Sequence, residues 1–405
     1  MNRSKLDALI MEQEGLNSLS RADIEAVQLQ KLNDLLSREQ QRQGFYGALP
    51  SKLDSLEELK ALPFTTDEDL ALNAPSLLLT SQAEIQRVLS DATSGTTGTA
   101  KRVFYTLGDC ENTVRLFMAG LSELIFPGSS TMICMPFSGP YGLGELIAEA
   151  VTRLGAKPLK LGVSLNYGEL SEVMDREKPD TFVGMPVQLL SLLRFCGKGS
   201  LRRALISGDA CPLSVTRRAE ELLGTRLFPH YGSREMGLGG AVTCPAHEGM
   251  HLRENHVIAE IIDEEGRPLP HGQYGELVIT TIGMEAMPLI RYRTGDYTRI
   301  LPPCPCGGVT RRIDAVSRRE GEISMEDLDS ALFAIPELVD YRAVFDGRLH
   351  IDARTVGGRG GDSLRRAAQA CCPNRDVTVQ VSAALGSDRP MYLGKRHIVR
   401  ESTGI

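Results

Sequence analysis

The chain has 405 residues, which is long enough for a large hydrophobic core and more than one domain. Its net charge of −7, with both signs mixed, argues against a nucleic-acid-binding protein, because such proteins usually carry a basic surplus. No run of ~18 apolar residues and no apolar leader occurs, and nine cysteines are an odd number, so we expect a cytoplasmic protein without a membrane span.

The N-terminal part predicts helices. Residues 1–45 are polar, with apolar side chains at helical spacing, so we expect one or two amphipathic helices packed on the large domain. The apolar positions are Ile24, Val27, Leu32 and Leu35. A short helix is expected over Leu56–Leu62, and Thr65-Thr66-Asp67 caps the next helix.

A glycine-rich loop follows, between expected strands at Ile85–Leu89 and Val103–Tyr105. Its centre reads Ser94-Gly95-Thr96-Thr97-Gly98-Thr99-Ala100-Lys101. Glycines let the main chain approach a ligand closely, and the hydroxyls, N–H groups and Lys101 suit phosphate oxygens. The segment misses the Walker pattern, because Ala100 and Arg102 replace a glycine and a magnesium-binding hydroxyl, and a strand follows. A flexible linker is the alternative interpretation.

The middle of the chain alternates strands and helices. Strands are expected over Thr131–Met135, Lys157–Leu161, Thr181–Val183, Ala204–Ile206 and Thr225–Phe228. Helices are expected over Cys110–Phe126, Glu145–Leu154, Tyr167–Glu177, Val187–Cys196 and Leu213–Leu223. This alternation indicates a mostly parallel sheet covered by helices, in which ligands bind at the carboxyl ends of the strands.

From Val257 the pattern changes to short strands and turns, which predicts an antiparallel subdomain. Its strands are expected over Val257–Asp263, Gly275–Thr281 and Tyr297–Leu301. A linker at Ser317–Gly321 precedes a small α+β region, with helices over Met325–Phe333 and Ser363–Cys371 and strands over Tyr341–Phe345, Leu349–Ala353 and Val377–Val381. The fold class is therefore α/β, with a large domain over 1–316 and a small α+β domain over 317–405.

The segment SGTTGTAK resembles the phosphate-binding loop of the acyl-adenylate-forming enzymes, in which SGTTG-x-P-K is usual. Phe45-Tyr46 and LDSLEELKALPFTTDED, residues 53–69, resemble the phenylacetate–CoA ligase branch of that superfamily. The resemblance runs from about Leu29 to about Ile313 and resumes near the C-terminus. It implies an enzyme that uses ATP and Mg²⁺ to activate a small-molecule carboxylic acid as acyl-AMP and passes the acyl group to CoA. It also implies a mobile C-terminal domain and a homodimer.

Two later segments resemble nucleotide-binding motifs of that family. Ser207-Gly208-Asp209-Ala210 follows a strand, and the resemblance implies that it lies against adenine, whereas the residues alone fit an ordinary strand-to-helix turn equally well. His230-Tyr231-Gly232-Ser233-Arg234-Glu235 resembles Y-G-x-[ST]-E, which implies that Tyr231 lies beside adenine and Glu235 holds Mg²⁺. Arg234 stands where the family has a hydroxyl that contacts the α-phosphate, so Ser233 or the Arg234 guanidinium is the candidate replacement.

Three further residues follow from the same resemblance. Arg291-Tyr292-Arg293-Thr294-Gly295-Asp296 resembles Y-R-T-G-D, and the ionised carboxylate of Asp296 suits both ribose hydroxyls. Arg312 matches an arginine that reaches the ribose. Leu393–Arg400 resembles a terminal G-K-x-x-R-V run, which makes Lys395 the candidate for adenylation, with Thr96, Lys101 and Glu235 as the other catalytic candidates. Read alone, these motifs are turns and a solvated lysine.

The acyl pocket is expected at two strand ends. Phe137-Ser138-Gly139-Pro140-Tyr141-Gly142 and Gly184-Met185-Pro186 match segments that border the carboxylic substrate in the family. Phe137 and Tyr141 suit stacking on an aryl acid, and core packing explains them equally well.

Cys244 and His251, followed by Cys304 and Cys306, form two pairs that could give a tetrahedral Cys₃His zinc site. Thiolates suit zinc in a reducing compartment, and His247 is a competing ligand. Unliganded thiols in tight turns and a redox role are the alternatives.

The hinge departs from the family pattern. The family has R-I-x-G-R-x-D-D, whereas this chain has Arg312-Ile313-Asp314-Ala315-Val316-Ser317-Arg318-Arg319. The glycine, the second arginine and both aspartates are missing, which bears on the transfer to CoA. We therefore keep two alternatives to the ligase: an adenylyltransferase that releases the AMP adduct, and a nucleotide-binding regulatory protein with a degenerate site.

Overall fold

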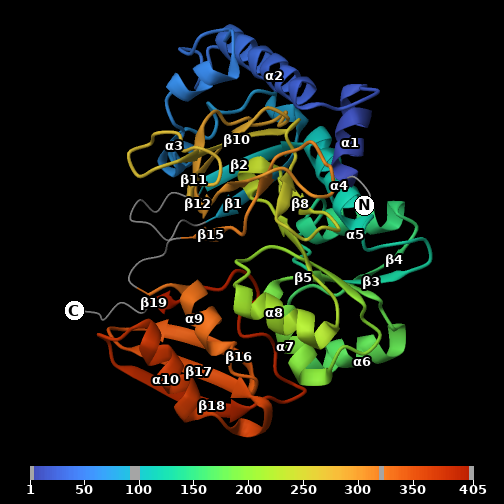
Figure 1. Ribbon diagram of the computed structural model, residues 1–405, viewed down its shortest axis with the longest axis vertical. Helices are drawn as coiled ribbons and strands as arrows, with labels where there is room; N and C mark the ends of the chain where they lie inside the picture. The colour runs from blue at the N-terminus through green and yellow to red at the C-terminus, as the bar shows by residue number, and fades with distance from the viewer. Residues whose placement is uncertain (1–3, 92–100, 319–322, 401–405) are drawn as a thin grey trace. The chain divides into compact units, whose positions relative to one another are not determined.

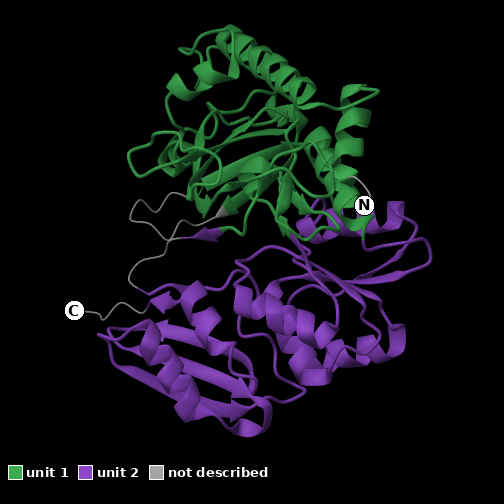
Figure 2. Cartoon of the chain, in the orientation of Figure 1, with its two compact units in different colours: residues 1–123, 230–316 green, residues 124–229, 317–405 purple. Residues whose placement is uncertain are grey.

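The computed structural model describes residues 4–91, 101–318 and 323–400. The chain divides into two compact units, residues 1–123 with 230–316 and residues 124–229 with 317–405 (Figure 2). No helix within the described residues is both long and apolar enough to cross a membrane.

The first unit begins with two helices, α1 (Lys5–Glu14) and α2 (Arg21–Arg42) (Figure 1). Helix α2 starts at a capping box, in which the Ser20 hydroxyl accepts from the Asp23 N–H and the Asp23 carboxylate accepts from the Ser20 N–H. The apolar face of α1 packs in one cluster with Ile24 of α2 and Leu116 of α4 (Leu107–Leu121). The expected amphipathic helices are therefore confirmed. A 3₁₀ turn at Leu56–Ala61 and helix α3 (Asp67–Asn73), capped by Thr66, follow as expected.

Antiparallel strands make up the rest of this unit. Strands β1 (Ile85–Asp91) and β2 (Lys101–Thr106) form the expected hairpin. Strand β11 (Gly275–Thr281) lies between β10 (Val257–Ile262) and β12 (Tyr292–Thr298). A second group contains β8 (Ala241–Thr243), β9 (Met250–Leu252), β14 (Arg312–Ile313) and β13 (Ile300–Leu301), and His230 and Tyr231 pair with β8.

The second unit contains the parallel sheet that the strand–helix alternation predicts. Its order is β4 (Lys157–Lys160), β3 (Ser130–Cys134), β5 (Thr181–Gly184), β6 (Arg203–Ile206) and the start of β7 (Phe228–Tyr231). The connecting helices are α5 (Leu143–Arg153), α6 (Tyr167–Glu177), α7 (Pro186–Cys196) and α8 (Leu213–Leu223), and α7 packs against both α6 and α8. Right-handed crossovers of this kind bring the strand ends to one edge of the sheet.

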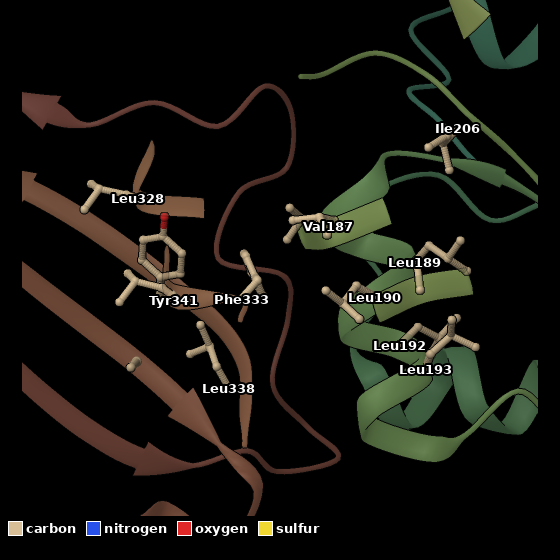
Figure 3. Packing of buried hydrophobic residues seen from close by; sticks show 14 of the residues in the cluster. Val187, Leu189, Leu190, Leu192, Leu193, Ile206, Leu328, Phe333, Leu338 and Tyr341 are labelled. Carbon is tan, nitrogen blue, oxygen red and sulfur yellow. The ribbon is translucent and has the colours of Figure 1, made fainter. Parts of the chain in front are cut away.

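The C-terminal segment of the second unit has the sheet order β18 (Val377–Ala383), β17 (Leu349–Thr355), β16 (Leu338–Phe345), β19 (Val399–Arg400). Its helices are α9 (Met325–Leu332) and α10 (Gly361–Cys371), with a 3₁₀ turn at Val356–Gly358. Figure 3 shows Phe333 and Leu338 of this segment facing Val187 and Leu190 of α7, within one continuous buried cluster. The α+β segment is thus packed on the parallel part of its unit.

Several elements differ from the sequence-based expectations, and no strands were expected at β8, β9 or β14. The strand expected at Thr225–Phe228 lies at Phe228–Tyr231, so the YGSRE motif begins inside a strand. The strand expected at Tyr297–Leu301 is divided into β12 and β13, and the TGD motif lies within β12. Gly295 of that motif has φ +69°, which a residue with a Cβ rarely adopts, and it lies at an irregularity in the pairing of β12 with β11 rather than in a separate turn. Strand β19 was not expected.

Candidate functional site

Strand β12 and the loop after β7 lie side by side in the first unit. The hydroxyl of Tyr231 donates to Asp296 Oδ2 over 2.8 Å. Glu235 lies four residues after Tyr231, and Tyr292 lies four residues before Asp296. The Tyr292 hydroxyl lies 3.5 Å from Glu235 Oε1. Because side chains alternate along a strand, Tyr292 and Asp296 emerge on the same face of β12, and both are buried. The YGSRE and YRTGD motifs therefore meet at two points.

Lys101 at the start of β2 joins the same group. Its ammonium lies 3.3 Å from Glu235 Oε1, 3.3 Å from the Tyr292 hydroxyl and 3.0 Å from Asp67 Oδ1. Burial alone would lower the pKa of Lys101, but the Glu235 and Asp67 carboxylates overcome this and raise it. The Tyr292 hydroxyl also donates to Asp67. The result is a cationic head enclosed by two carboxylates and a phenol.

The loop that carries Glu235 is closely packed. A Cβ at Gly232 would lie 2.5 Å from the carbonyl oxygen of Leu238, so only glycine fits there. The Ser233 carbonyl accepts from the Leu238 N–H over 2.8 Å. The Arg234 carbonyl accepts from the hydroxyl of buried Tyr105 over 2.8 Å. These contacts fix the backbone on both sides of Glu235, so its carboxylate is held toward Lys101.

Two further groups of expected nucleotide residues are residues 94–99 and Arg312. Residues 94–99, which include Thr96, lie outside the described residues. Arg312 is buried, and its guanidinium donates to the carbonyls of Glu248, Pro302 and Pro303. In this structure Arg312 thus supports the loop that carries Cys304.

In the second unit, the ends of three parallel strands meet as expected. Gly208 has φ +87°, and a Cβ there would lie 3.3 Å from Met135 Cε and 3.6 Å from Met185 Cγ. Ser207 donates its N–H to the Gly184 carbonyl over 3.0 Å, and the Ala210 N–H donates to Asp209 Oδ1 over 2.9 Å. The expected adenine segment therefore lies against Met185, next to Pro186 at the start of α7.

The other expected pocket residues follow β3. Tyr141 has φ +59°, and the Gly142 N–H donates to the Gly139 carbonyl over 3.0 Å, which closes a tight turn. The Lys160 ammonium lies 6.0 Å from the centre of the Phe137 ring. Phe137 therefore pairs with a cation at the edge of the sheet, rather than filling the core.

Lys395 is exposed, and the residue after it is not. The Arg396 N–H donates to Asp209 Oδ2 over 2.8 Å, and the Arg396 guanidinium is buried against Asp329 and Asp340. Burial is the main cause that raises the pKa of Asp209 to about 6. The segment with Lys395 and the expected adenine segment are thus in direct contact within the second unit.

The two cysteine pairs come together in the first unit. The ligand atoms of Cys244, His251, Cys304 and Cys306 all lie within 4.8 Å of one another, and all four residues are buried. The Sγ atoms of Cys244 and Cys304 are 3.6 Å apart, and His251 Nε2 is 3.5 Å from Cys306 Sγ. A tetrahedral zinc ion with Zn–S near 2.3 Å and Zn–N near 2.0 Å would place such pairs about 3.8 Å and about 3.5 Å apart. The geometry therefore fits that ion.

The surroundings of these ligands also suit a metal. Each thiol accepts a backbone N–H from two residues later: Ala246 for Cys244, Cys306 for Cys304 and Gly308 for Cys306. Burial lowers the pKa of His251 to about 4, which keeps the ring neutral. His251 Nδ1 lies 2.9 Å from the Thr310 hydroxyl, which lies 3.4 Å from Asp7 Oδ1 on α1. Such outer partners orient a metal-binding imidazole.

Sequence reasoning missed three residues of these sites. The sequence predicts only a helix cap for Asp67, and for Tyr292 only membership of the segment that resembles Y-R-T-G-D. Both side chains contact Lys101 only through the tertiary fold, so the sequence carried no signal that places them there. Arg396 carried no signal of its own, because a basic residue in a basic run is typical of a solvated tail.

Comparisons with known proteins identify the family and the fold. The family model described as AMP-binding enzyme matches residues 57–286. Phenylacetate–CoA ligase of Thermus thermophilus is 29% identical over 82% of this chain and 80% of its own length, and that of Escherichia coli is 30% identical over 76% and 74%. The fold is that of 2-hydroxyisobutyryl-CoA ligase with a bound acyl adenylate, with TM-score 0.75, 19% identity, and coverage of 93% of this chain and 90% of that one.

Proposed function

Because the chain belongs to the AMP-binding enzyme family, among its acyl-adenylate-forming CoA ligases, we propose that the groups described above carry out this chemistry on one ATP and one carboxylic acid. The observation that carries the proposal is the contact of three motifs, through Lys101, Glu235 and the Tyr231–Asp296 pair. A half-buried lysine enclosed by carboxylates from distant segments is typical of a ligand-binding site.

In the first step, one carboxylate oxygen of the acid attacks the α-phosphorus of ATP. The bond from that phosphorus to the pyrophosphate oxygen breaks, and pyrophosphate leaves with the electron pair. Asp296 accepts from the ribose hydroxyls and Tyr231 borders the adenine, so the nucleotide is held in line for attack. Lys101 and Lys395 place positive charge near the phosphates and the acid, and residues 94–99 supply N–H groups and hydroxyls.

Magnesium fits the first unit by the chemistry of its donors. Glu235 and Asp67 offer hard carboxylate oxygens close to Lys101, and Mg²⁺ prefers such oxygens together with nucleotide phosphates. When bound, the ion neutralises phosphate charge. Glu235 is the residue we assign to hold it, and the Lys101 ammonium, 3.3 Å away, orients that carboxylate.

In the second step, the thiol sulfur of CoA attacks the acyl carbon, and AMP leaves with the electron pair while the thiol proton passes to solvent. We assign residues 317–405 as the domain that moves between the two steps, about the linker at 317–321. The altered hinge favours one other outcome, release of the acyl adenylate itself, because the second arginine and both aspartates are missing after Arg312.

Product analysis separates these outcomes. Purified protein is incubated with ATP, Mg²⁺ and phenylacetate, octanoate or 2-hydroxyisobutyrate, with and without CoA, and pyrophosphate, AMP and thioester are measured. A ligase forms AMP and thioester in equal amounts only with CoA. Accumulated acyl adenylate that CoA does not consume identifies the adenylyltransferase. ATP binding without turnover of any acid identifies a regulatory protein.

We also propose a structural zinc ion, held by Cys244, His251, Cys304 and Cys306. It would fix the loop at 302–309 to β9, and through Thr310 and Asp7 it would be linked to α1. The Val309 N–H donates to Asp7 Oδ2 over 2.8 Å, so one carboxylate supports both the loop and the histidine. Reduced thiols of this kind suit the cytoplasm.

A further inference from the structure

The guanidinium of Arg396 is buried and almost fully bonded. Its Nε lies 3.1 Å from both oxygens of Asp329, and its Nη1 lies 3.2 Å from Asp340 Oδ1. Its Nη2 lies 3.0 Å from Asp329 Oδ1 and 3.3 Å from the Tyr341 carbonyl. The rings of Phe333, Tyr341 and Tyr392 surround it, with centres 5.4, 4.6 and 4.8 Å from Cζ.

The two carboxylates that bind Arg396 are themselves fixed. Asp329 on α9 accepts from the Tyr341 hydroxyl over 2.7 Å. Asp340 on β16 accepts from the Tyr167 hydroxyl over 2.9 Å and from the Met391 N–H over 2.7 Å. A buried network of this kind is weak evidence for stability, since apolar residues of similar volume often do as well, but it specifies one geometry.

The backbone of the same segment contacts the expected adenine segment. The Arg396 N–H donates to Asp209 Oδ2 over 2.8 Å. On its other side, the Tyr392 hydroxyl donates to the His397 carbonyl over 2.8 Å and accepts from the Ala343 N–H. A cavity of about 20 Å³ remains beside Asp209, Gly394 and Arg396, which has room for about one water. Residues 392–397 are therefore closely seated.

The side chain of Lys395 is exposed, while that of the residue after it is buried. An exposed lysine on a flexible tail would lose much conformational entropy when it meets a substrate. One whose backbone is already fixed loses only side-chain freedom.

We propose that Arg396 is a positioning residue: it anchors the backbone on which Lys395 stands, and its N–H bond to Asp209 sets that backbone against the adenine segment for the adenylation step. This inference rests on the proposed function of Lys395. It assigns no contact of Arg396 with the substrate. When the C-terminal segment moves for thioester formation, the bonds of Arg396 to Asp329 and Asp340 travel with it, whereas its bond to Asp209 breaks, as does the bond from the Tyr167 hydroxyl to Asp340.

The kinetic test uses Arg396→Lys, which keeps the charge but not the fork of donors, and Asp209→Asn, which keeps the side-chain shape. The matched control is Arg375→Lys, an exposed arginine over the Phe345 ring of the same domain. Pyrophosphate–ATP exchange is measured with the acid of the panel that wild type uses fastest, and thioester formation is measured separately from synthetic acyl adenylate and CoA.

We expect Arg396→Lys to lower kcat for exchange at least tenfold, with KM for ATP and acid changed less than twofold and thioester formation within twofold of wild type. Asp209→Asn should also lower kcat for exchange, by a smaller factor, and leave thioester formation unchanged. If Arg396→Lys melts at a lower temperature than wild type, the result with Asp209→Asn decides whether the inference holds. Equal losses in both half-reactions, or wild-type exchange in both variants, would overturn the inference.

A second readout does not depend on catalysis. Amide hydrogen exchange of residues 392–400 should be at least tenfold faster in Arg396→Lys than in wild type or Arg375→Lys. Unchanged protection would overturn the anchoring role. Amide exchange could be faster in Arg396→Lys while wild type shows no acid-dependent pyrophosphate exchange at all. In that case the proposed function fails and the anchoring role stands. Full pyrophosphate exchange in Lys395→Ala would instead remove the lysine that Arg396 is said to position.

Discussion

The hydroxyl of Tyr231 lies 2.8 Å from Asp296 Oδ2, which joins two motifs that are 65 residues apart in the chain. Tyr231 ends β7 and Asp296 lies on the buried face of β12. A phenol that donates to a carboxylate holds it in one orientation, and this fixes the direction of the oxygens offered to a nucleotide. The pair therefore orients the carboxylate that we propose binds the ribose hydroxyls.

Removing the carboxylate should weaken nucleotide binding. Asp296→Ala deletes hydrogen bonds to a charged acceptor, worth about 1.5–3 kcal/mol, so KM for ATP should rise about 10–100-fold. Tyr231→Phe removes only the orienting bond of about 1 kcal/mol and should raise KM about fivefold. The control is Tyr274→Phe, whose hydroxyl donates to the Tyr297 carbonyl at the surface. Unchanged KM for ATP in Asp296→Ala would contradict the ribose assignment.

Lys101 should act as a permanent cation. Its pKa is raised, so the charge is present below its ordinary value near 10.5 and is lost only as pH rises beyond it. The alkaline limb of the rate profile up to pH ~9.5 should therefore be the same in wild type and Lys101→Arg. Lys101→Met should lower kcat/KM by ~10²-fold, a usual effect of removing one preorganised charge. A profile that falls near pH 8 in wild type but not in Lys101→Arg would show that the carboxylates do not hold the proton.

Zinc should copurify with the protein at about one ion per chain when the preparation is mild. Cys304→Ser removes one ligand and should lower the zinc content to a small fraction, whereas Cys196→Ser, at the end of α7, should leave it unchanged. Metal analysis measures both. Less than ~0.2 zinc per chain in the wild-type protein would contradict a structural site of this kind.

Asp7 should tune that metal without touching it. Its carboxylate accepts from the Val309 N–H and lies near the Thr310 hydroxyl that meets His251. Asp7→Asn should weaken zinc binding ~10–100-fold in a chelator competition, as for other outer partners. The control is Glu12→Gln, an exposed acid on the same helix α1. Equal zinc affinity in wild type and Asp7→Asn would show that α1 and the metal loop are not coupled.

Asp209 should leave a signature in the pH dependence of stability. Its folded pKa of about 6 lies above the unfolded value of about 3.8, so the folded protein binds this proton more tightly between the two. The contribution to the free energy of unfolding is full below pH ~4 and is lost as pH rises through ~6, by at most about 3 kcal/mol. Urea unfolding of Asp209→Asn from pH 4 to 8 should show this slope removed. Asp352→Asn, an exposed residue on β17, should keep the wild-type slope. Parallel curves for wild type and Asp209→Asn would contradict the burial effect.

Much of the fold could be predicted from the sequence, because each helix of the parallel part has its own periodicity, and α6 also begins at a capping box. Helices α6 and α8 lie at the expected residues, and the parallel direction of the strands follows from their alternation with helices, although their order, with β3 between β4 and β5, does not. Strand β12 was misplaced because Gly295 suggests a turn locally, whereas the strand pairs with β11 on both sides of Gly295, with a shift of register between them. That pairing is a tertiary effect, which local propensity does not contain.

The sites divide in the same way. The cysteine cluster could be found by counting, because thiols and histidine are rare and their pairs are close in sequence. The burial of Arg396 could not, because the two carboxylates that bind it lie 56 and 67 residues away and nothing in LGKRHIVR distinguishes it from its exposed neighbours. Sequence patterns report the rare ligand types, and packing decides which charged residues are structural.

Acid-dependent exchange of labelled pyrophosphate into ATP tests the central claim most directly. With phenylacetate, octanoate and 2-hydroxyisobutyrate as probes, wild type should incorporate label only when a suitable acid and Mg²⁺ are present, and Asp296→Ala and Lys395→Ala should each lose most of that rate. Release of ADP and phosphate in place of pyrophosphate, or exchange that proceeds equally well without any acid, would contradict the account.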